Sequence, residues 1–340
     1  AFAGYTVLHT RTPVRIGVLV PMTGFIELKE PREWARDNLN RQGGIGGRPI
    51  ELVYRDTSQG DTAALARELL ADDSIRIVIG PPTSDNVYEL MPEFAQENKI
   101  LISPLTTSGD IILAFGKEGS FWRTAQGDVA QVKVILSTLK DKKVSRVAIL
   151  AENSTYGQTF YDWTGFFATE YGIDVVSIRQ YEPGGGTLKA GVQEALACDP
   201  DYILLAGQGG DAAIVRQAIG QSGRDVKLFL TDAGGTPELI RLLGPAAEGI
   251  EGTSPTADPA TGFSVAYEEK FGHPPADYAA QAYDAVLLAA YTTARQEATF
   301  FESPQDSVRA VVYGNGTAEG WDAQESHEAV AAIRSGGTPA

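Results

Sequence analysis

The sequence IRIVIGPPTSDNVYELMPEFAQENKILISPLTTSG, at residues 75–109, decides the fold. It contains two short apolar runs, at 75–79 and 100–102, that are rich in β-branched residues, as buried parallel strands are. Each run ends in a turn that carries small hydroxylated residues, and a helical pattern of apolar residues lies between the two. This order predicts strand–helix units in an open α/β sheet.

Small hydroxylated side chains follow both predicted strands. In an open α/β sheet, ligands bind outside the carboxyl ends of the strands, where loops lead into helices. Free backbone N–H groups and the helix dipole there attract an anion. We therefore expect a cradle for a carboxylate, with Ser84 and Thr107 as hydroxyl donors. For Ser84 alone, the competing interpretation is an ordinary helix N-cap.

Composition bounds the class of protein. A chain of 340 residues exceeds one typical core and indicates two domains. With 28 Lys+Arg and 44 Asp+Glu, the net charge is 28 − 44 = −16, which argues against a nucleic-acid partner because phosphate contacts need basic patches. Cys198 is the only cysteine and the three histidines are far apart in the sequence, so we expect neither an intrachain disulfide nor a metal site.

Targeting signals are also absent from the given residues. No window approaches the roughly 18 consecutive apolar residues that a membrane span needs. The first residues, AFAGYTVLHTRTP, lack the basic and apolar regions of a signal peptide and include no initiating Met, so we expect a processed or trimmed form.

Strand-like runs occur in two series, separated by helical patterns, which predicts parallel sheets covered on both faces. The predicted strands are 14–20, 50–55, 75–79, 100–102 and 121–128, then 147–150, 175–178, 202–205, 228–230 and a weaker 249–253. The predicted helices are 31–42, one capped by Asp61, one after residue 84, then 157–171, 188–197, 210–222, 236–243, 263–271, 276–297, 304–312 and 323–335. The two similar series suggest a duplicated architecture.

One glycine motif raises a competing function. GQGGDA at 207–212 fits the G-x-G-x-x-A dinucleotide fingerprint and lies between a predicted strand and a predicted helix. Asp232 follows the next strand, where the fingerprint places a ribose-binding acid. A short glycine pattern in a chain with 37 glycines is weakly specific, and this fingerprint usually opens the first βαβ unit. An NAD-dependent enzyme therefore ranks third among the functions, and an NAD-induced melting shift would favour it.

Nine segments occur in the order in which one family has them: VRIGVLVPMTG, GGIGGRPIELVYRDT, VIGPPTS, ISPLTTS, FWRTA, VAILAENSTYGQ, GDAA, AAEGIEGT and ADYAAQAYDAV. They cover roughly residues 14–297, and the chain resembles the type I periplasmic binding proteins of the leucine/isoleucine/valine-binding class, the solute receptors of ABC importers. The resemblance implies an α/β fold of two doubly wound parallel-sheet lobes, joined by a multi-strand hinge of three crossovers, with ligand enclosed between the lobes.

The resemblance also divides the chain. Crossovers are expected near residue 126 and at 254–262. The first lobe would then comprise residues 14–125 plus 256–312, and the second would comprise 126–255 plus 313–340.

Site residues follow from the resemblance position by position. In the amino-acid-binding branch, the GPxxS serine and the SPxxT threonine hold the ligand carboxylate, which implies Ser84 and Thr107 here. The ligand ammonium is held by a carbonyl, here that of Leu105, and by an acid after the fourth strand of the second lobe, here Asp232. A tyrosine that packs on the ligand corresponds to Tyr156. Thr106, in the same loop as Leu105, completes the set on the first lobe.

Three departures from the family pattern affect the site and the tail. The segment after PMTG is shorter than usual, and Phe25 lies where a contact to the ligand side chain would begin. Gln208 stands where several amino-acid binders have tyrosine. The sequence also stops before the last strand that normally returns across the lobes. The first two departures bear on side-chain specificity, and the third bears on the fold of the tail.

The resulting expectation is a non-enzymatic, extracytoplasmic or periplasmic solute-binding protein of an ABC importer. It would bind a small α-amino acid, with a branched-chain or other apolar side chain, without a cofactor, and deliver it to membrane permease subunits. The precursor would carry a signal peptide, and a lipid anchor on it is left open. The alternative is an amide, urea or small-carboxylate receptor, or a ligand-sensing regulator of the same fold, which loss of the ammonium-binding role of Asp232 would favour.

Overall fold

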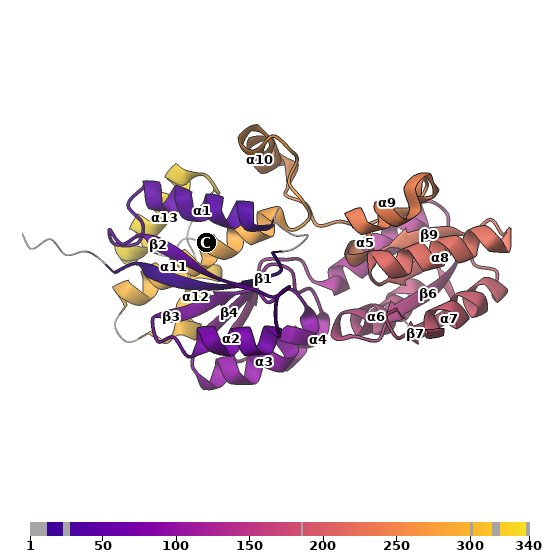
Figure 1. The fold of residues 1–340 in the computed structure, drawn as a ribbon, viewed down its shortest axis with the longest axis horizontal. Coiled ribbons are helices and arrows are strands. Elements are labelled where there is room, and N and C mark those ends of the chain that lie inside the picture. The colour runs from indigo at the N-terminus through magenta and orange to yellow at the C-terminus, as the bar shows by residue number, and fades with distance from the viewer. Residues whose placement is uncertain (1–11, 23–27, 185, 300–301, 315–319, 338–340) are drawn as a thin grey trace, which may run out of the picture.

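The computed structural model describes residues 12–22, 28–184, 186–299, 302–314 and 320–337. They form two α/β lobes, side by side along the long axis of the molecule (Figure 1). Each lobe is built on a five-stranded parallel sheet. The predicted α/β fold with two doubly wound lobes is therefore confirmed.

The first sheet has the order β2-β1-β3-β4-β5. Its central strands are buried along almost their whole length, because helices cover both faces, and their sequences are accordingly continuous apolar runs. The strands are β1 (Val14–Val20), β2 (Ile50–Asp56), β3 (Ile75–Ile79), β4 (Ile100–Ser103) and β5 (Phe121–Arg123).

The second sheet has the order β10-β9-β8-β6-β7. Read from its other edge, this order repeats that of the first sheet: the second strand lies on one side of the first, and the third, fourth and fifth lie on the other. The duplicated architecture suggested by the sequence is therefore present in the topology. The strands are β6 (Arg146–Glu152), β7 (Asp174–Tyr181), β8 (Tyr202–Ala206), β9 (Lys227–Leu230) and β10 (Glu251–Gly252).

Helices cover both faces of each sheet. Those of the first lobe are α1 (Lys29–Arg41), α2 (Thr62–Leu70), α3 (Ser84–Gln96), α4 (Gly109–Phe115), α10 (Phe263–Phe271), α11 (Ala279–Ala298), α12 (Pro304–Val312) and α13 (Ala323–Arg334). Those of the second are α5 (Asp128–Asp141), α6 (Thr155–Tyr171), α7 (Gly186–Ala197), α8 (Gly209–Ser222) and α9 (Pro237–Leu243). Short 3₁₀ turns occur at Asp232–Gly234, Gly244–Ala247 and Pro259–Thr261.

The C-terminal helix α13 corrects the expected division of the chain. Residues 313–340 were assigned to the second lobe, yet α13 packs against α1 and α11, and Ala329, Val330 and Ile333 belong to the core of the first lobe. Figure 1 shows this helix, in yellow, within the first lobe. The reason is its apolar stripe, which finds a partner surface on α11.

Two segments connect the lobes in the described part of the chain, one after β5 and one after β10. The third crossover that the family pattern implied does not occur there, because α12 and α13 both stay on the first lobe. The lobes also touch directly: the backbone N–H of Gly109, at the start of α4, donates to Thr159 Oγ1 of α6 at 3.0 Å. Ser108 contacts the same hydroxyl at 3.1 Å.

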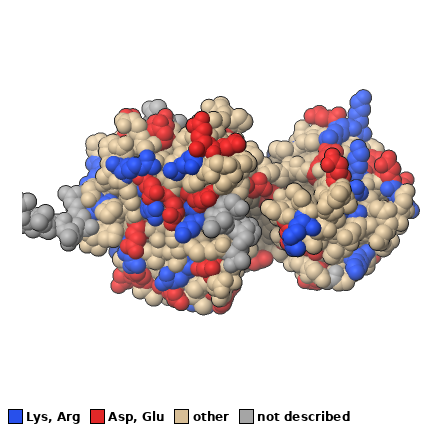
Figure 2. Space-filling model, turned by 45° about the horizontal axis from the view of Figure 1, so that its top comes forward, with Lys and Arg blue, Asp and Glu red and all other residues tan. Residues whose placement is uncertain are grey.

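Charge is distributed over both lobes rather than gathered into one patch. On the face in Figure 2, acidic and basic side chains are interspersed, and no broad basic area is visible. Most of the ion pairs among the described residues include at least one exposed side chain. Such pairs contribute little to stability individually.

Candidate ligand-binding site

A cavity of about 400 Å³ lies between the lobes, at the carboxyl ends of strands from both sheets. In doubly wound sheets this is the edge where ligands bind, beside the strands at which the chain changes direction. Residues after β1, β3 and β4 line it from the first lobe, and residues after β6, β8 and β9 line it from the second. The lining comprises Pro21, Leu28, Pro82, Thr83, Ser84, Asp85, Leu105, Thr107, Glu152, Tyr156, Gln208, Asp232, Ala233, Thr236, Ala276, Asp277 and Tyr278.

The first lobe contributes neutral hydroxyl groups. Ser84 is the first residue of α3, and Thr107 follows β4; both are 5% exposed and line the cavity. The helix cap is Thr83, whose side chain accepts from the backbone N–H of Asn86 at 3.3 Å. The Ser84 hydroxyl therefore does not serve as the cap that the competing interpretation assigned to it.

The loop after β4 splits into residues that line the cavity and one that does not. Leu105 lines the cavity beside Thr107. Thr106 is fully buried away from it, and its hydroxyl lies 2.8 Å from Ser103 Oγ, which donates to it. The structure therefore does not bring Thr106 into the candidate site, because alternate residues of this loop face opposite sides.

The second lobe contributes one carboxylate held by two tyrosines. Asp232 begins the 3₁₀ turn after β9 and is 9% exposed. Its Oδ1 accepts from the Tyr156 hydroxyl at 2.7 Å, and its Oδ2 accepts from the Tyr278 hydroxyl. Burial, together with the charge of Asp232, raises the pKa of both tyrosines well above the usual range. Both hydroxyls therefore stay protonated donors at neutral pH.

Tyr278 is a site residue that the sequence reasoning missed. It stands directly before α11 with a left-handed backbone, φ +64°, which is uncommon for a large side chain. This conformation accompanies its hydrogen bond to Asp232 across the connection between the lobes. Its signal was its place in ADYAAQAYDAV, one of the segments on which the family resemblance depends.

Glu152 and Gln208 lie beside each other on the second lobe. Glu152 ends β6 and is 5% exposed, and Gln208 is the residue before α8. Glu152 Oε1 accepts from Ser154 Oγ at 2.7 Å, while Oε2 lies 3.4 Å from Gln208 Nε2, a long contact. Burial raises the pKa of Glu152. The sequence reasoning identified Gln208 as a candidate and missed Glu152.

Another acidic group, outside the cavity lining, lies near Asp232. Asp128, the first residue of α5, is fully buried, and neither carboxylate oxygen has a hydrogen-bond partner of ordinary geometry. Burial and the charge of Asp232 raise its pKa well above the usual range, although Thr107 and Arg123 act in the opposite direction. Arg123 donates to the backbone carbonyl of Thr107 at 2.8 Å.

Two of the three glycines of GQGGDA have a packing explanation. A Cβ at Gly207 would lie 1.8 Å from the Tyr181 hydroxyl, and one at Gly209 would lie 2.2 Å from Thr236 Oγ1. Both positions therefore exclude larger residues because of close neighbours. The motif packs β8 and α8 against their surroundings, and this weakens the nucleotide-binding interpretation.

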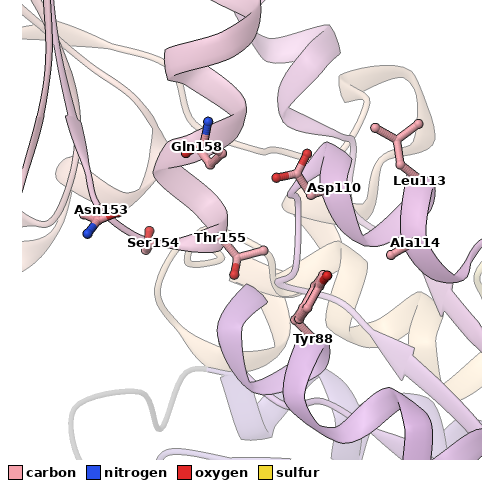
Figure 3. Close-up of a pocket in the computed structure, with 8 residues that line it drawn as sticks. All are labelled: Tyr88, Asp110, Leu113, Ala114, Asn153, Ser154, Thr155 and Gln158. Carbon is pink, nitrogen blue, oxygen red and sulfur yellow. The ribbon is translucent and has the colours of Figure 1, made fainter.

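A larger and more open hollow lies outside the candidate site. It measures about 670 Å³ and lies between α3, α4 and the start of α6 (Figure 3). Its lining includes Tyr88 and Leu113, which are 49% and 74% exposed, and none of the predicted ligand-binding residues. Ligand sites enclose most of the ligand surface and converge polar groups on it. The cavity around Asp232 meets this description better.

Phe25, metal-binding groups and membrane-spanning helices are the remaining features that the sequence analysis considered. Phe25 lies outside the described residues. Within residues 12–22, 28–184, 186–299, 302–314 and 320–337, no group of three His, Cys, Asp or Glu side chains is placed to hold a metal ion. No helix in the same ranges combines the length and apolar character needed to cross a membrane.

Comparisons with known proteins identify binding proteins that are similar to this chain. The family model described as periplasmic binding protein matches residues 13–325. The chain is 28% identical to a chemotactic signal transduction system substrate-binding protein, BasB of Halobacterium salinarum, over 62% of this chain and 54% of that protein. It is 30% identical to a Leu/Ile/Val-binding protein, BraC3 of Rhizobium johnstonii, over 44% of this chain and 42% of that protein. The matched parts thus span about half the length of these curated relatives.

A solved structure is similar over nearly the whole chain. It is the branched-chain amino acid transporter substrate-binding protein LivJ of Streptococcus pneumoniae in complex with isoleucine, with a TM-score of 0.73 and 23% identity. The similarity covers 91% of this chain and 90% of that one. At this identity the likeness shows a shared fold.

Proposed function

The chain belongs to the periplasmic binding protein family, a family of binding proteins rather than enzymes, and from this premise we propose that it binds a small α-amino acid between its lobes. The observation that carries the proposal is the pairing of groups across one cavity. Ser84 and Thr107, with neutral hydroxyl groups, line the cavity from the first lobe, and Asp232, with a carboxylate, lines it from the second. Hydroxyl and backbone donors suit an α-carboxylate, and a carboxylate acceptor suits an α-ammonium group.

Ligand binding couples the lobes in this proposal. The α-carboxylate is held by the first lobe and the α-ammonium by the second, so a bound amino acid bridges them. Removal of water from the cavity strengthens both interactions. The ligand therefore favours a closed arrangement of the lobes over an open one, because only the closed arrangement satisfies both of its charged ends.

The cellular role follows from the family. We infer that the protein acts outside the cytoplasm, in the periplasm or cell envelope, and delivers its ligand to the permease subunits of an ABC importer. The names of one relative and of the solved structure support this role, since they describe Leu/Ile/Val binding and branched-chain amino acid transport. The apolar side chains of Pro21, Leu28 and Leu105 in the cavity suit methylene or methyl groups of a ligand.

Isothermal titration calorimetry with the protein amino acids tests the proposal. Each binding amino acid is then compared with its deaminated and its decarboxylated analogue. We expect binding of at least one amino acid and a large loss for both analogues, because each lacks one of the two charged ends. Binding of urea or simple amides, with no amino acid bound, would overturn the proposal and identify an amide receptor of the same fold.

A further inference from the structure

The lining of the cavity carries acidic side chains that one α-ammonium group does not balance. Asp85, Glu152, Asp232 and Asp277 are among the lining residues, and no Lys or Arg belongs to that lining in the described part of the chain. An amino acid with a neutral side chain is a zwitterion and adds no net charge to this environment. A cleft lined by one sign of charge favours a ligand of the opposite sign.

The sheet topology separates Asp232 and Glu152 by a distance that one small ligand can span. Asp232 follows β9, Gln208 follows β8 and Glu152 ends β6, and these strands are neighbours in that order. Adjacent strands are about 4.8 Å apart, so Glu152 is displaced from Asp232 by about 10 Å along the sheet edge. A ligand bound through its ammonium at Asp232 can therefore extend past Gln208 to Glu152.

Glu152 itself lacks strong compensation for its burial. One carboxylate oxygen accepts a hydrogen bond from Ser154 at 2.7 Å. The other has only the 3.4 Å contact with Gln208. The side chain is 5% exposed, and the charges of Asp211 and Asp85 lie near it. A buried carboxylate with one poor partner is costly unless a cation or a donor completes it.

Asp128 shows that negative charge is poorly compensated at the Asp232 end of the cavity. It is fully buried beside Asp232, and neither of its oxygens has a hydrogen-bond partner of ordinary geometry. Arg123 lies near it but donates to the carbonyls of Thr107 and Ser108. The Asp232 end of the cavity therefore disfavours any further negative charge, and no described Lys or Arg side chain is hydrogen-bonded to Asp128.

We propose that the ligand is an α-amino acid with a basic side chain, such as lysine or ornithine, whose side-chain cation binds Glu152 beside Gln208. This inference rests on the proposed function, since it assumes that Asp232 binds the α-ammonium. The methylenes of such a side chain pack on Leu28 and Leu105, and its cation replaces the long Gln208 contact as the partner of Glu152. It replaces the expectation of a branched-chain or other apolar side chain.

Calorimetry with a matched ligand pair tests this inference on the unmodified chain. Norleucine has the same carbon chain as lysine and lacks its terminal amine. We expect lysine or ornithine to bind about ten-fold or more tightly than norleucine at pH 7, because a charge-assisted bond to a buried carboxylate is lost in norleucine. Tighter binding of norleucine or leucine would overturn the inference and leave the proposed function intact. Absence of binding for every amino acid would instead refute the proposed function.

A variant then assigns the effect to one side chain. Glu152→Gln should remove the preference for lysine, with lysine weakened about ten-fold or more and norleucine unchanged or improved. Glu182→Gln is the matched control, because Glu182 lies outside the cavity lining and accepts from Asn153 at 2.7 Å. A lysine preference that survives in a folded Glu152→Gln protein would overturn the role of Glu152. If that variant does not fold, the comparison of lysine with norleucine on the unmodified chain still tests the inference.

Discussion

Asp85 in the first lobe accepts a hydrogen bond of 2.8 Å from the backbone N–H of Thr155, the first residue of α6 in the second lobe. The Thr155 hydroxyl donates to the same carboxylate oxygen. A carboxylate at a helix N-terminus satisfies unpaired N–H groups and interacts favourably with the helix dipole. One lobe thus caps a helix of the other, and this contact lies at the rim of the ligand cavity, which Asp85 also lines.

Removal of this cap should destabilise the contact between the lobes. Asp85→Ala leaves the Thr155 N–H without its partner, and we expect a loss of about 1 kcal/mol in the free energy of unfolding. Urea denaturation measures the change. Glu89→Ala, an exposed acid on the same helix, is the control and should have little effect. Equal effects of the two substitutions would show that the contact between the lobes contributes nothing.

Ligand binding should make the molecule more compact. Two connecting segments join the lobes in the described part of the chain, and the ligand cavity lies between the two lobes. Small-angle scattering with a saturating amino acid, chosen by the calorimetric screen, should give a smaller radius of gyration than scattering without it. An unchanged radius at confirmed saturation would contradict closure.

The hydroxyls of Ser84 and Thr107 should hold the ligand carboxylate. Ser84→Ala combined with Thr107→Val should weaken amino-acid binding by about 1 kcal/mol or more for each lost hydrogen bond, and backbone donors should leave residual affinity. Thr106→Val is a matched control, because this hydroxyl is buried against Ser103 and does not line the cavity. It should lower stability and leave affinity unchanged. Normal binding by the double variant would place the carboxylate elsewhere.

Much of the fold could be predicted from the sequence. Apolar runs of β-branched residues identify buried parallel strands, and the prediction of 14–20 and 75–79 matches β1 and β3 residue for residue. Helices were less completely predicted: α4 and α5 were not named, since a seven-residue helix such as α4 has too few turns to show a period. The place of α13 depends on contacts with α11, from which it is separated in the sequence by α12. The periodicity of a helix does not indicate which distant helix it will contact.

The candidate site was predicted in part, because some of its residues lie at predicted strand ends and others are brought there by tertiary contacts. Ser84, Thr107, Leu105, Tyr156, Gln208 and Asp232 follow strand ends in recognisable segments, and the structure brings all six to one cavity. Tyr278 and Glu152 reach it through the connection between the lobes and through the order of β6, β8 and β9. Both relationships are tertiary; the place of Tyr278 in ADYAAQAYDAV was the one sequence signal for that residue.

Asp128 should make stability depend on pH in a defined direction. Burial and Asp232 raise its pKa in the folded state, so the native protein binds a proton that the unfolded chain releases at lower pH. This stabilisation is complete below the unfolded pKa of about 3.9 and is lost as pH rises through the folded value. Asp128→Asn stays neutral throughout. We therefore expect the melting temperature of the variant, minus that of the unmodified chain, to increase as pH rises from 4 to 8.

A flat difference across this range would show that Asp128 is not held protonated by its surroundings. Glu182→Gln is the matched control, since it removes one carboxylate from an exposed position outside the cavity. Other buried acids titrate in the same range in both proteins, and the subtraction removes their contribution to first order.

Asp232 should be the partner of the ligand ammonium group. Asp232→Asn keeps the shape of the side chain and removes its charge, which leaves the ammonium without a counter-charge in the closed arrangement that we propose. Truncation of one member of a buried pair costs roughly 3–5 kcal/mol, or about 10² to 10³-fold in affinity. Calorimetry should show this loss for the amino acid and a much smaller change for its deaminated analogue. Asp277→Asn removes the same charge from the same cavity and is the control, because Asp277 is bonded to Ser254 rather than to the tyrosines that hold Asp232. Equal losses for the two ligands, or for the two variants, would mean that Asp232 acts only through the general potential of the cavity and would refute its role as the ammonium partner.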